Sequence, residues 1–297
     1  MSEVLQNMSE GLAALVKTAG QSVVKVEARR RNAGSGILWS NEGIIVTANH
    51  VVERDEDIKV GLPDGKSVAA NLVGRDQTTD VAILRLESKG HPVAKWAEPS
   101  SLQVGHLVLG LGRPGLSIQA TLGVVSALGE GWRTPAGGQV DRYLQTDLLM
   151  YPGFSGGALV NMAGEIVGLN TSGLLRGLSI AVPAPTVRQV TDEILKHGKV
   201  QRGYLGVGCQ PVRLPTQLRQ PGQETGLLVI SVESGSPADK AGVYVGDIIV
   251  ALGSQAVNSF TDLLALLDAE HIGKGVPLRV IRGGNMQTLT ATIIERE

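Results

Sequence analysis

The chain has 297 residues, of which 42% are hydrophobic, and its 27 Lys and Arg residues nearly balance 28 Asp and Glu residues. This length and composition indicate a globular protein of about two domains, and a net charge of −1 argues against a nucleic-acid-binding class. A single cysteine, Cys209, excludes an internal disulfide, and no apolar run reaches the roughly 18–20 residues of a membrane span. We expect no metal or cofactor.

The first 20 residues predict a short amphipathic helix. Over residues 3–18 the apolar side chains recur at helical spacing, at Val4, Leu5, Met8, Leu12, Leu15 and Val16. Glu3 and Glu10 argue against a secretory signal, because such signals begin with basic residues. We therefore expect a cytoplasmic location, or an extracytoplasmic one if a leader has been removed.

From residue 23 to about residue 183 the pattern changes to short apolar and period-two runs. Examples are "SVVKVEA", "GIIVTANHVV", "VAILRLE", "HLVLGLG" and "ATLGVVSAL", with Gly, Asp, Asn or Pro between most of them. A dozen or so strands at this spacing favour an all-β barrel or a pair of barrels. Residues 184–199 then predict a helix that Gly198 can end.

The last 97 or so residues predict a separate, small α+β unit. "GYLGVGCQPV", "TGLLVISV" and "VGDIIVALG" read as strands, and "SPADKAG" reads as a helical turn. "SFTDLLALLDAE" predicts a helix with Ser259 as its N-cap, and a hairpin closes around Gly283, Gly284 and Asn285. The expected organisation is a helix over 1–20, a β-barrel domain over 21–198 and a small domain over 199–297.

The stretch "GFSGG" surrounds one serine, Ser155, with glycines. This is typical of a tight turn, but also of a nucleophile whose neighbouring N–H groups must point at a reacting carbonyl. A serine nucleophile needs a base and a group that orients the base. His50, at the end of "GIIVTANHVV", is a polar residue in an apolar strand, and Asp80 stands at the start of another. The other four histidines lie where a structural role suffices: His91, His106, His197 and His271.

The order His50, Asp80, Ser155 is that of the chymotrypsin-type double β-barrel, which is also the expected fold. "GFSGG" fits the nucleophile elbow of α/β-hydrolase esterases as well, but that elbow requires a helix after the serine. Here "GGALVNMAGEIVGLNTSG" reads as strand, turn and strand. The elbow is therefore disfavoured.

Taken together, "GSGIL", "GIIVTANHVV", "RDQTTDVAILRL" and "QTDLLMYPGFSGGALVN" resemble the HtrA/Deg serine proteases over residues 20–297. The resemblance implies a trypsin-like domain followed by one PDZ domain. It further implies that Ser155 attacks the scissile carbonyl, that His50 moves its proton and that Asp80 orients the imidazole. The N–H groups of Gly153 and Ser155 would form the oxyanion hole, and Thr171, Ser172 and Gly173 would pair with substrate.

The resemblance also assigns a peptide site to the C-terminal domain, in the loop "GYLGV". Its N–H groups at Tyr204, Leu205 and Gly206 would hold a peptide carboxylate, while the last peptide side chain would lie among Leu205, Val207, Leu263 and Leu267. The implied partners are unfolded polypeptides and C-terminal peptides, and the implied assembly is a homotrimer.

The sequence departs from the family at Phe154, where members usually have Asn, and residues 1–30 contain no aromatic residue. Phe154 either packs under the serine loop or holds it inactive. The main hypothesis is a serine endopeptidase acting on unfolded proteins, and the alternative is a catalytically silent PDZ adaptor or holdase. The resemblance implies that residues 149–153 and 178–182 wall the pocket for the substrate side chain at the cut site. Neither segment contains an acidic residue, which predicts cleavage after small or medium aliphatic residues.

Overall fold

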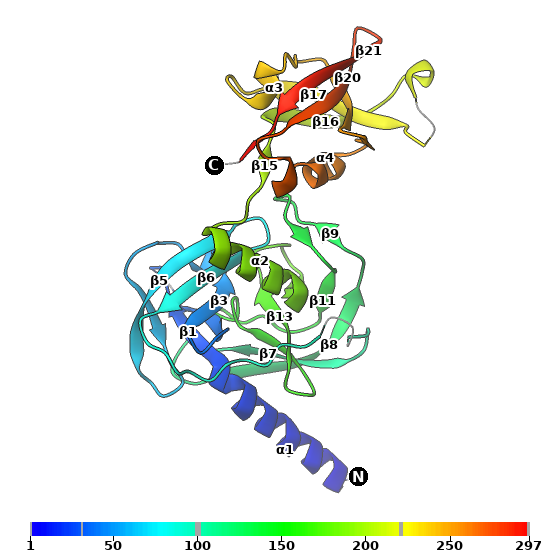
Figure 1. The fold of residues 1–297 in the computed structure, drawn as a ribbon. Helices are drawn as coiled ribbons and strands as arrows, with labels where there is room; N and C mark the ends of the chain where they lie inside the picture. The colour runs from blue at the N-terminus through cyan, green and yellow to red at the C-terminus, as the bar shows by residue number, and fades with distance from the viewer. Residues whose placement is uncertain (1, 31, 99–101, 220–221, 296–297) are drawn as a thin grey trace. The chain divides into compact units, whose positions relative to one another are not determined.

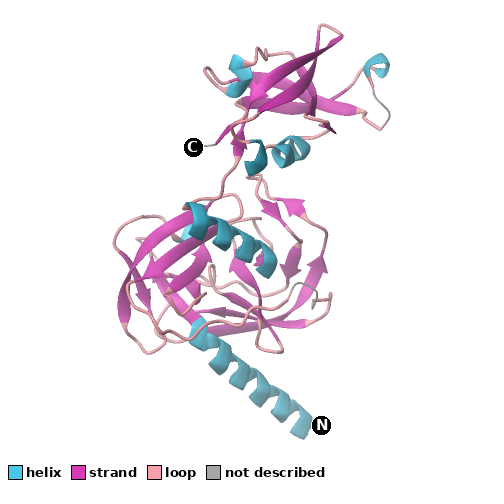
Figure 2. Cartoon of the chain, in the orientation of Figure 1, coloured by secondary structure: helices cyan, strands magenta, loops and turns pink. Residues whose placement is uncertain are grey.

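The computed structural model describes residues 2–30, 32–98, 102–219 and 222–295. The chain divides into two compact units, residues 1–200 and 201–297 (Figure 1). Strands dominate both units (Figure 2), so the expected mainly β fold is confirmed. Within the described ranges, none of the helices has the length and apolar character that crossing a membrane would need.

The first unit begins with helix α1 (Ser2–Ala19), which matches the expected amphipathic helix. Leu12, Leu15 and Val16 pack against the protein core, whereas Val4 and Leu5 are about two-thirds exposed. The C-terminal half of the helix is therefore the part that packs on the barrels. A short 3-10 turn, η1 (Gly20–Ser22), follows it and leads into the first strand.

Each of the two barrels in this unit closes with six strands, as a chymotrypsin-like fold requires. The first barrel has the order β1-β2-β3-β6-β5-β4 and is built from β1 (Val23–Glu27), β2 (Gly34–Leu38), β3 (Ile44–Ala48), β4 (Ile58–Gly61), β5 (Ser67–Asp76) and β6 (Val81–Leu86). The second has the order β11-β14-β13-β12-β7-β8 and is built from β7 (Leu107–Gly112), β8 (Gln119–Leu128), β11 (Leu144–Thr146), β12 (Ala158–Asn161), β13 (Ile166–Thr171) and β14 (Ser179–Pro183).

Two further elements complete the first unit. A small hairpin pairs β9 (Trp132–Arg133) with β10 (Gln139–Val140). Helix α2 (Ala184–His197) buries Val187, Val190 and Ile194 against the core, and Gly198 ends it in a left-handed conformation. The helix lies over strands of both barrels, since it contacts β5, β6, β13 and β14 (Figure 1).

The second unit is a small antiparallel sheet with short helices, as the sequence predicts. Its sheet has the order β16-β17-β18-β20-β21, and a separate pair joins β15 to β22. The elements are β15 (Gly203–Tyr204), β16 (Val207–Arg213), β17 (Thr225–Val232), α3 (Pro237–Lys240), β18 (Ile248–Leu252), β19 (Gln255–Ala256), α4 (Phe260–Leu266), β20 (Gly275–Arg282), β21 (Asn285–Thr292) and β22 (Ile294–Glu295).

Helix α4 is shorter than the sequence pattern predicts. Ser259 caps its N-terminus in a reciprocal capping box with Asp262, but the helix ends at Leu266 instead of continuing to Glu270. The side chain of Asp268 accepts the N–H of His271 and begins a separate 3-10 turn. An Asp side chain that bonds to the backbone in this way competes with helical hydrogen bonding, which accounts for the early end.

Candidate active site

His50 and Asp80 are brought together by the pairing of two buried strands. In the ladder between β3 and β6, Ala48 lies opposite Val81. His50 follows Ala48 in a 3-10 turn at the end of β3, and Asp80 immediately precedes β6. Residues 30 positions apart in the chain therefore leave the same edge of the first barrel. Asp80 adopts a left-handed φ of +60°, which an Asp side chain tolerates better than most.

The buried carboxylate of Asp80 binds His50 at two points, one on the ring and one on the backbone. Its Oδ2 atom lies 2.8 Å from His50 Nδ1, and its Oδ1 atom accepts the His50 backbone N–H at 2.9 Å. The hydroxyl of Thr171, from β13 of the second barrel, also donates to Oδ2. A carboxylate at Nδ1 favours the tautomer with the proton on that nitrogen. Nε2 is then left as a proton acceptor.

Ser155 lies in the loop before β12 and is 7% exposed. The loop reaches the end of β3, because a Cβ at the next residue, Gly156, would stand 2.4 Å from Thr47 Oγ1 and 3.1 Å from the Ala48 N atom. The Ser155 hydroxyl pairs with that of Ser172 at 3.1 Å. Among the described residues, no hydrogen bond joins the Ser155 hydroxyl to the His50 ring, so the three side chains do not form a continuous chain of bonds.

The backbone around Ser155 presents two unused donors. The N–H groups of Gly153 and Ser155 donate to no acceptor in the described part of the chain. Gly157 N–H binds the Phe154 carbonyl at 2.9 Å, and since the two sides of a trans peptide point in opposite directions, the Ser155 N–H points away from that bond. Gly153 has φ +90°, and a Cβ there would stand 2.5 Å from Pro114 Cβ, so only glycine fits.

Ser35 binds the backbone of this loop. No role was predicted for this residue. Its side chain is completely buried in β2, and its hydroxyl donates to the Gly153 carbonyl at 2.6 Å. Its backbone N–H donates to the Ser155 carbonyl at 3.0 Å. The carbonyls on both sides of Phe154 are therefore bound. A hydroxyl inside the buried run "GSGIL" was the signal that could have indicated this role.

Phe154, the departure from the family pattern, packs under the loop. Its side chain is completely buried, and its ring meets that of Tyr151 edge-on with centroids 5.8 Å apart. The ring also lies directly against the end of β7, because a Cβ at Gly112 would stand 3.0 Å from it. The aromatic ring thus fills the space between the serine loop and the end of β7.

The segment Thr171–Gly173 is occupied by contacts within the chain. Thr171 is the last residue of β13 and pairs with Ile180 of β14. The N–H of Gly173 donates to the Thr171 hydroxyl at 2.9 Å, and Ser172 bonds to Ser155 as described above. In this conformation the segment supports Asp80 and the serine, and a substrate strand would have to displace the Gly173 bond.

In the second unit, the residues predicted to bind a peptide lie at one end of the sheet. Leu205, Leu263 and Leu267 are buried in the core of the unit, and Val207 is partly buried beside them. Tyr204 ends β15, where it pairs with Ile294. β16 is an edge strand of the sheet, and α4 lies against it. An edge strand beside a helix is the arrangement in which a peptide can add as a further strand.

The loop before β16 has two free donors and a glycine that the geometry requires. In the described residues, the N–H groups of Leu205 and Gly206 donate to no acceptor. Gly206 has φ +82°, and a Cβ there would stand 2.2 Å from Ser236 Cβ. Adjacent free amides in a turn can bind an anion such as a carboxylate.

Comparison with known proteins agrees with both units. Residues 34–169 match the trypsin-like peptidase domain model, and residues 203–293 match the PDZ domain model. A crystal structure of the serine endoprotease from Yersinia pestis superposes with a TM-score of 0.79 and 31% identity, over 95% of this chain and 97% of that one. The chain belongs to the HtrA family of serine proteases. The HtrA-type protease AlgW with a decapeptide is also similar, at 28% identity and a TM-score of 0.79, over 96% of this chain and 98% of that one.

The curated HtrA relatives are longer than this chain. A DegP-like periplasmic serine endoprotease of Pseudomonas putida (strain GB-1) is 38% identical over 278 residues. The match covers 89% of this chain but 57% of that protein. The chain therefore spans little more than half the length of such relatives.

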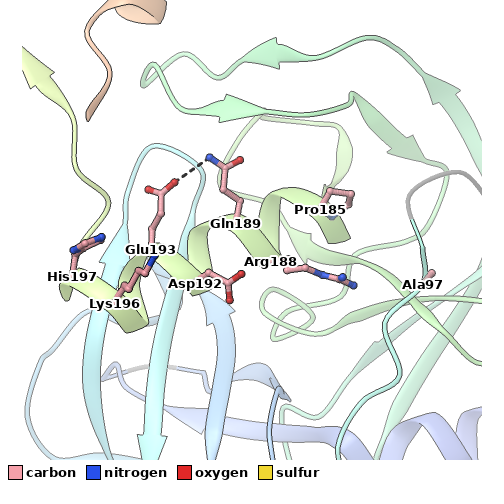
Figure 3. Close-up of a pocket in the computed structure, with 8 residues that line it drawn as sticks. All are labelled: Ala97, Pro185, Arg188, Gln189, Asp192, Glu193, Lys196 and His197. Atoms are coloured by element: carbon pink, nitrogen blue, oxygen red, sulfur yellow. Dashed lines mark hydrogen bonds between the residues drawn. The ribbon is translucent and has the colours of Figure 1, made fainter. Parts of the chain in front are cut away.

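This HtrA chain has a hollow and one cysteine outside the candidate site. A hollow of about 460 Å³ runs along helix α2, lined mainly by residues between Pro185 and His197, including a Gln189–Glu193 hydrogen bond of 3.0 Å (Figure 3). His50, Asp80 and Ser155 do not line it. Burial raises the pKa of the Cys209 thiol to about 11, which makes it a poor nucleophile. Within the described ranges, no group of acidic, His or Cys side chains could hold a metal ion.

Proposed function

We propose that the chain is a serine endopeptidase that hydrolyses peptide bonds in unfolded polypeptides with His50, Asp80 and Ser155. One observation carries the proposal: a buried carboxylate is bonded to His50 Nδ1 at the end of β3, and a serine loop with two free amide donors reaches that same strand end. This combination supplies a base, a group that orients the base and a site for negative charge.

The proposed reaction begins when the Ser155 hydroxyl turns from Ser172 toward His50. Nε2 of His50 takes the hydroxyl proton as the oxygen attacks the scissile carbonyl. Asp80 keeps the ring oriented and stabilises the imidazolium that forms. The N–H groups of Gly153 and Ser155 receive the negative oxygen of the tetrahedral intermediate. His50 then gives its proton to the leaving amine, and a water molecule releases the acyl group by the same steps.

We also propose that the C-terminal domain binds the free C-terminus of an extended peptide along β16. The free amides of Leu205 and Gly206 support this proposal, as does the peptide-bound state of the similar protein AlgW. A peptide with a free carboxylate should bind, and the same peptide with a C-terminal amide should bind much more weakly. Equal binding of the two would contradict the carboxylate site.

The silent-adaptor alternative also has one observation in its favour, namely that Ser155 bonds to Ser172 and not to His50. Cleavage of unfolded casein separates the two hypotheses, with Ser155→Ala as the control. We expect fragments from the wild type and none from the variant. If the wild type only protects casein from aggregation, at any peptide concentration, the adaptor hypothesis replaces the peptidase.

Two wider properties remain proposals. The DegP-like relatives from Pseudomonas are periplasmic endoproteases by name, which supports an extracytoplasmic compartment over the cytoplasmic one that the sequence led us to expect. The homotrimer implied by the family resemblance stays a prediction. Cell fractionation and analytical ultracentrifugation would test these two points.

A further inference from the structure

The segment after β7 contains a buried arginine that the catalytic proposal does not use. Arg113 is 6% exposed, and among the described residues no carboxylate acts on its pKa, which responds to burial alone. Its guanidinium instead donates to three backbone carbonyls: Nε to Val23 at 2.7 Å, Nη1 to Leu116 at 2.7 Å and Nη2 to Gly20 at 2.9 Å. Burial lowers the pKa of Arg113 from its usual value, so the site is costly for a charge.

Two of the three carbonyls belong to the connection between helix α1 and strand β1. Gly20 begins the 3-10 turn η1 that follows α1, and Val23 is the residue just after that turn. The Gly20 carbonyl also accepts the Val23 N–H, which closes the turn. The guanidinium therefore adds a charge-assisted donor to the connection between α1 and β1.

The backbone of Arg113 reaches the loop that holds the Gly153 and Ser155 amide donors, here called the oxyanion loop. Arg113 N–H donates to Ser35 Oγ at 2.7 Å, and Ser35 Oγ donates in turn to the Gly153 carbonyl at 2.6 Å. The next residue, Pro114, packs against Gly153 so closely that a Cβ there would stand 2.5 Å from Pro114 Cβ. The Arg113 side chain thus binds the connection between α1 and β1, while its backbone and Pro114 contact the oxyanion loop.

We propose that Arg113 is a positioning residue that attaches the oxyanion loop, through Ser35, to the connection between helix α1 and strand β1. The proposal rests on the peptidase proposed above for the role of that loop. Without the guanidinium bonds, residues 113–116 lose their attachment to residues 20–23. The Arg113 N–H and Pro114 then no longer hold Ser35 and Gly153 in one position, and the two amide donors become mobile.

The test compares Arg113→Met and Ser35→Ala with two matched controls in the same unit. Arg75→Met removes a guanidinium that binds the Val52 carbonyl at 2.9 Å, and Thr191→Val removes a buried hydroxyl that binds the Val187 carbonyl at 2.7 Å. Hydrogen exchange is measured by mass spectrometry on peptides covering residues 150–157. We expect about tenfold or faster exchange there in the two test variants and no change in the controls. If Arg113→Met fails to fold, Arg113→Lys, which can reach one carbonyl, should show an intermediate increase.

Kinetics supply the second measurement. In both test variants kcat/KM should fall by about 10- to 100-fold with KM within about threefold, because only stabilisation of the transition state is weakened. Unchanged exchange at 150–157 in Arg113→Met would overturn the proposal, even if Ser35→Ala responds, because Ser35 would then hold the loop without Arg113. If the two test variants show the expected faster exchange but the wild type never cleaves a peptide, the peptidase proposal is overturned instead. Exchange still decides the role of Arg113 in that case.

Discussion

Replacing Phe154 tests whether this unusual residue stabilises the serine loop or disables it. The ring is completely buried and lies on the backbone of β7 at Gly112, which cannot move in to fill a cavity. Truncation of a buried Phe to Ala costs about 3–5 kcal/mol, and a rigid neighbour favours the upper part of that range. Over a 200-residue unit this loss lowers the Tm of the protease unit by roughly 6–20 °C.

The assay is differential scanning calorimetry together with peptide cleavage below the first transition. Phe260→Ala is the matched control, because the only other phenylalanine is 44% exposed and should cost less than about 1 kcal/mol. For Phe154→Ala we expect kcat/KM to fall by about 10- to 100-fold as the oxyanion donors lose their support. Phe154→Asn, which introduces the usual residue of the family, should also lower both stability and activity. A rise in kcat/KM with Asn would refute this reasoning, since it would mean that the ring holds the loop inactive.

Three further predictions follow from single contacts. Thr171→Val removes the hydroxyl that donates to Asp80, and because a hydrogen bond to a charged group contributes about 1.5–3 kcal/mol, kcat/KM in peptide cleavage should fall by about 10- to 100-fold. Gly206→Ala forces a side chain into a left-handed φ of +82°, so affinity for a C-terminal peptide, measured by fluorescence anisotropy, should fall at least about tenfold. Burial opposes ionisation of Asp247, but its hydrogen bonds with Arg282 prevail and lower its pKa. Because the folded-state pKa lies below the unfolded value of about 3.9, this pair stabilises the PDZ unit above that pH. The stability is lost as the pH falls through the folded-state pKa, which urea unfolding between pH 7 and pH 3 should detect in the wild type but not in Asp247→Asn.

Each of these has a clear contrary result. Wild-type kcat/KM in Thr171→Val would mean that the backbone and ring contacts of His50 hold Asp80 without the hydroxyl. Unchanged peptide affinity in Gly206→Ala would remove the loop before β16 from the binding site. An equal response of wild type and Asp247→Asn to acid would assign the loss of stability to other carboxylates.

Much of the fold could be predicted because its signals are local. Period-two runs and turn residues indicate strands and hairpins, and the turn at Gly283–Gly284 joins β20 to β21 where the sequence predicts a hairpin. The predicted length of helix α4 was too long, because the residues that follow Leu266 still fit a helical pattern although Asp268 bonds to the backbone there. The spacing of apolar residues does not show that a side chain will compete with the helical backbone hydrogen bonds.

The candidate residues were predicted from residue type and chain order, and so was the place of Thr171 near Asp80, but the contacts of Ser35 and Arg113 were not. The proximity of His50 to Asp80 follows from the register of two neighbouring strands. By contrast, Ser35 lies 118 positions from Gly153, and Arg113 lies 93 from Gly20. A serine in "GSGIL" and an arginine in "GRPG" have many possible partners, and only the closure of two barrels decides which carbonyls they reach. The Ser155–Ser172 pair also depends on side-chain rotation that no sequence pattern encodes.

Covalent labelling with a fluorophosphonate tests the central claim most directly, because the serine oxygen displaces fluoride from phosphorus only where a base and an oxyanion site activate it. Ser155 of the wild type should be labelled, and Ser155→Ala should not. His50→Ala and Asp80→Asn should slow the reaction by about 10³- to 10⁴-fold, whereas the control His91→Ala should react like the wild type. A wild type that takes no label with unfolded substrate and C-terminal peptide present, or a His50→Ala variant that reacts at the wild-type rate, would contradict the proposed mechanism.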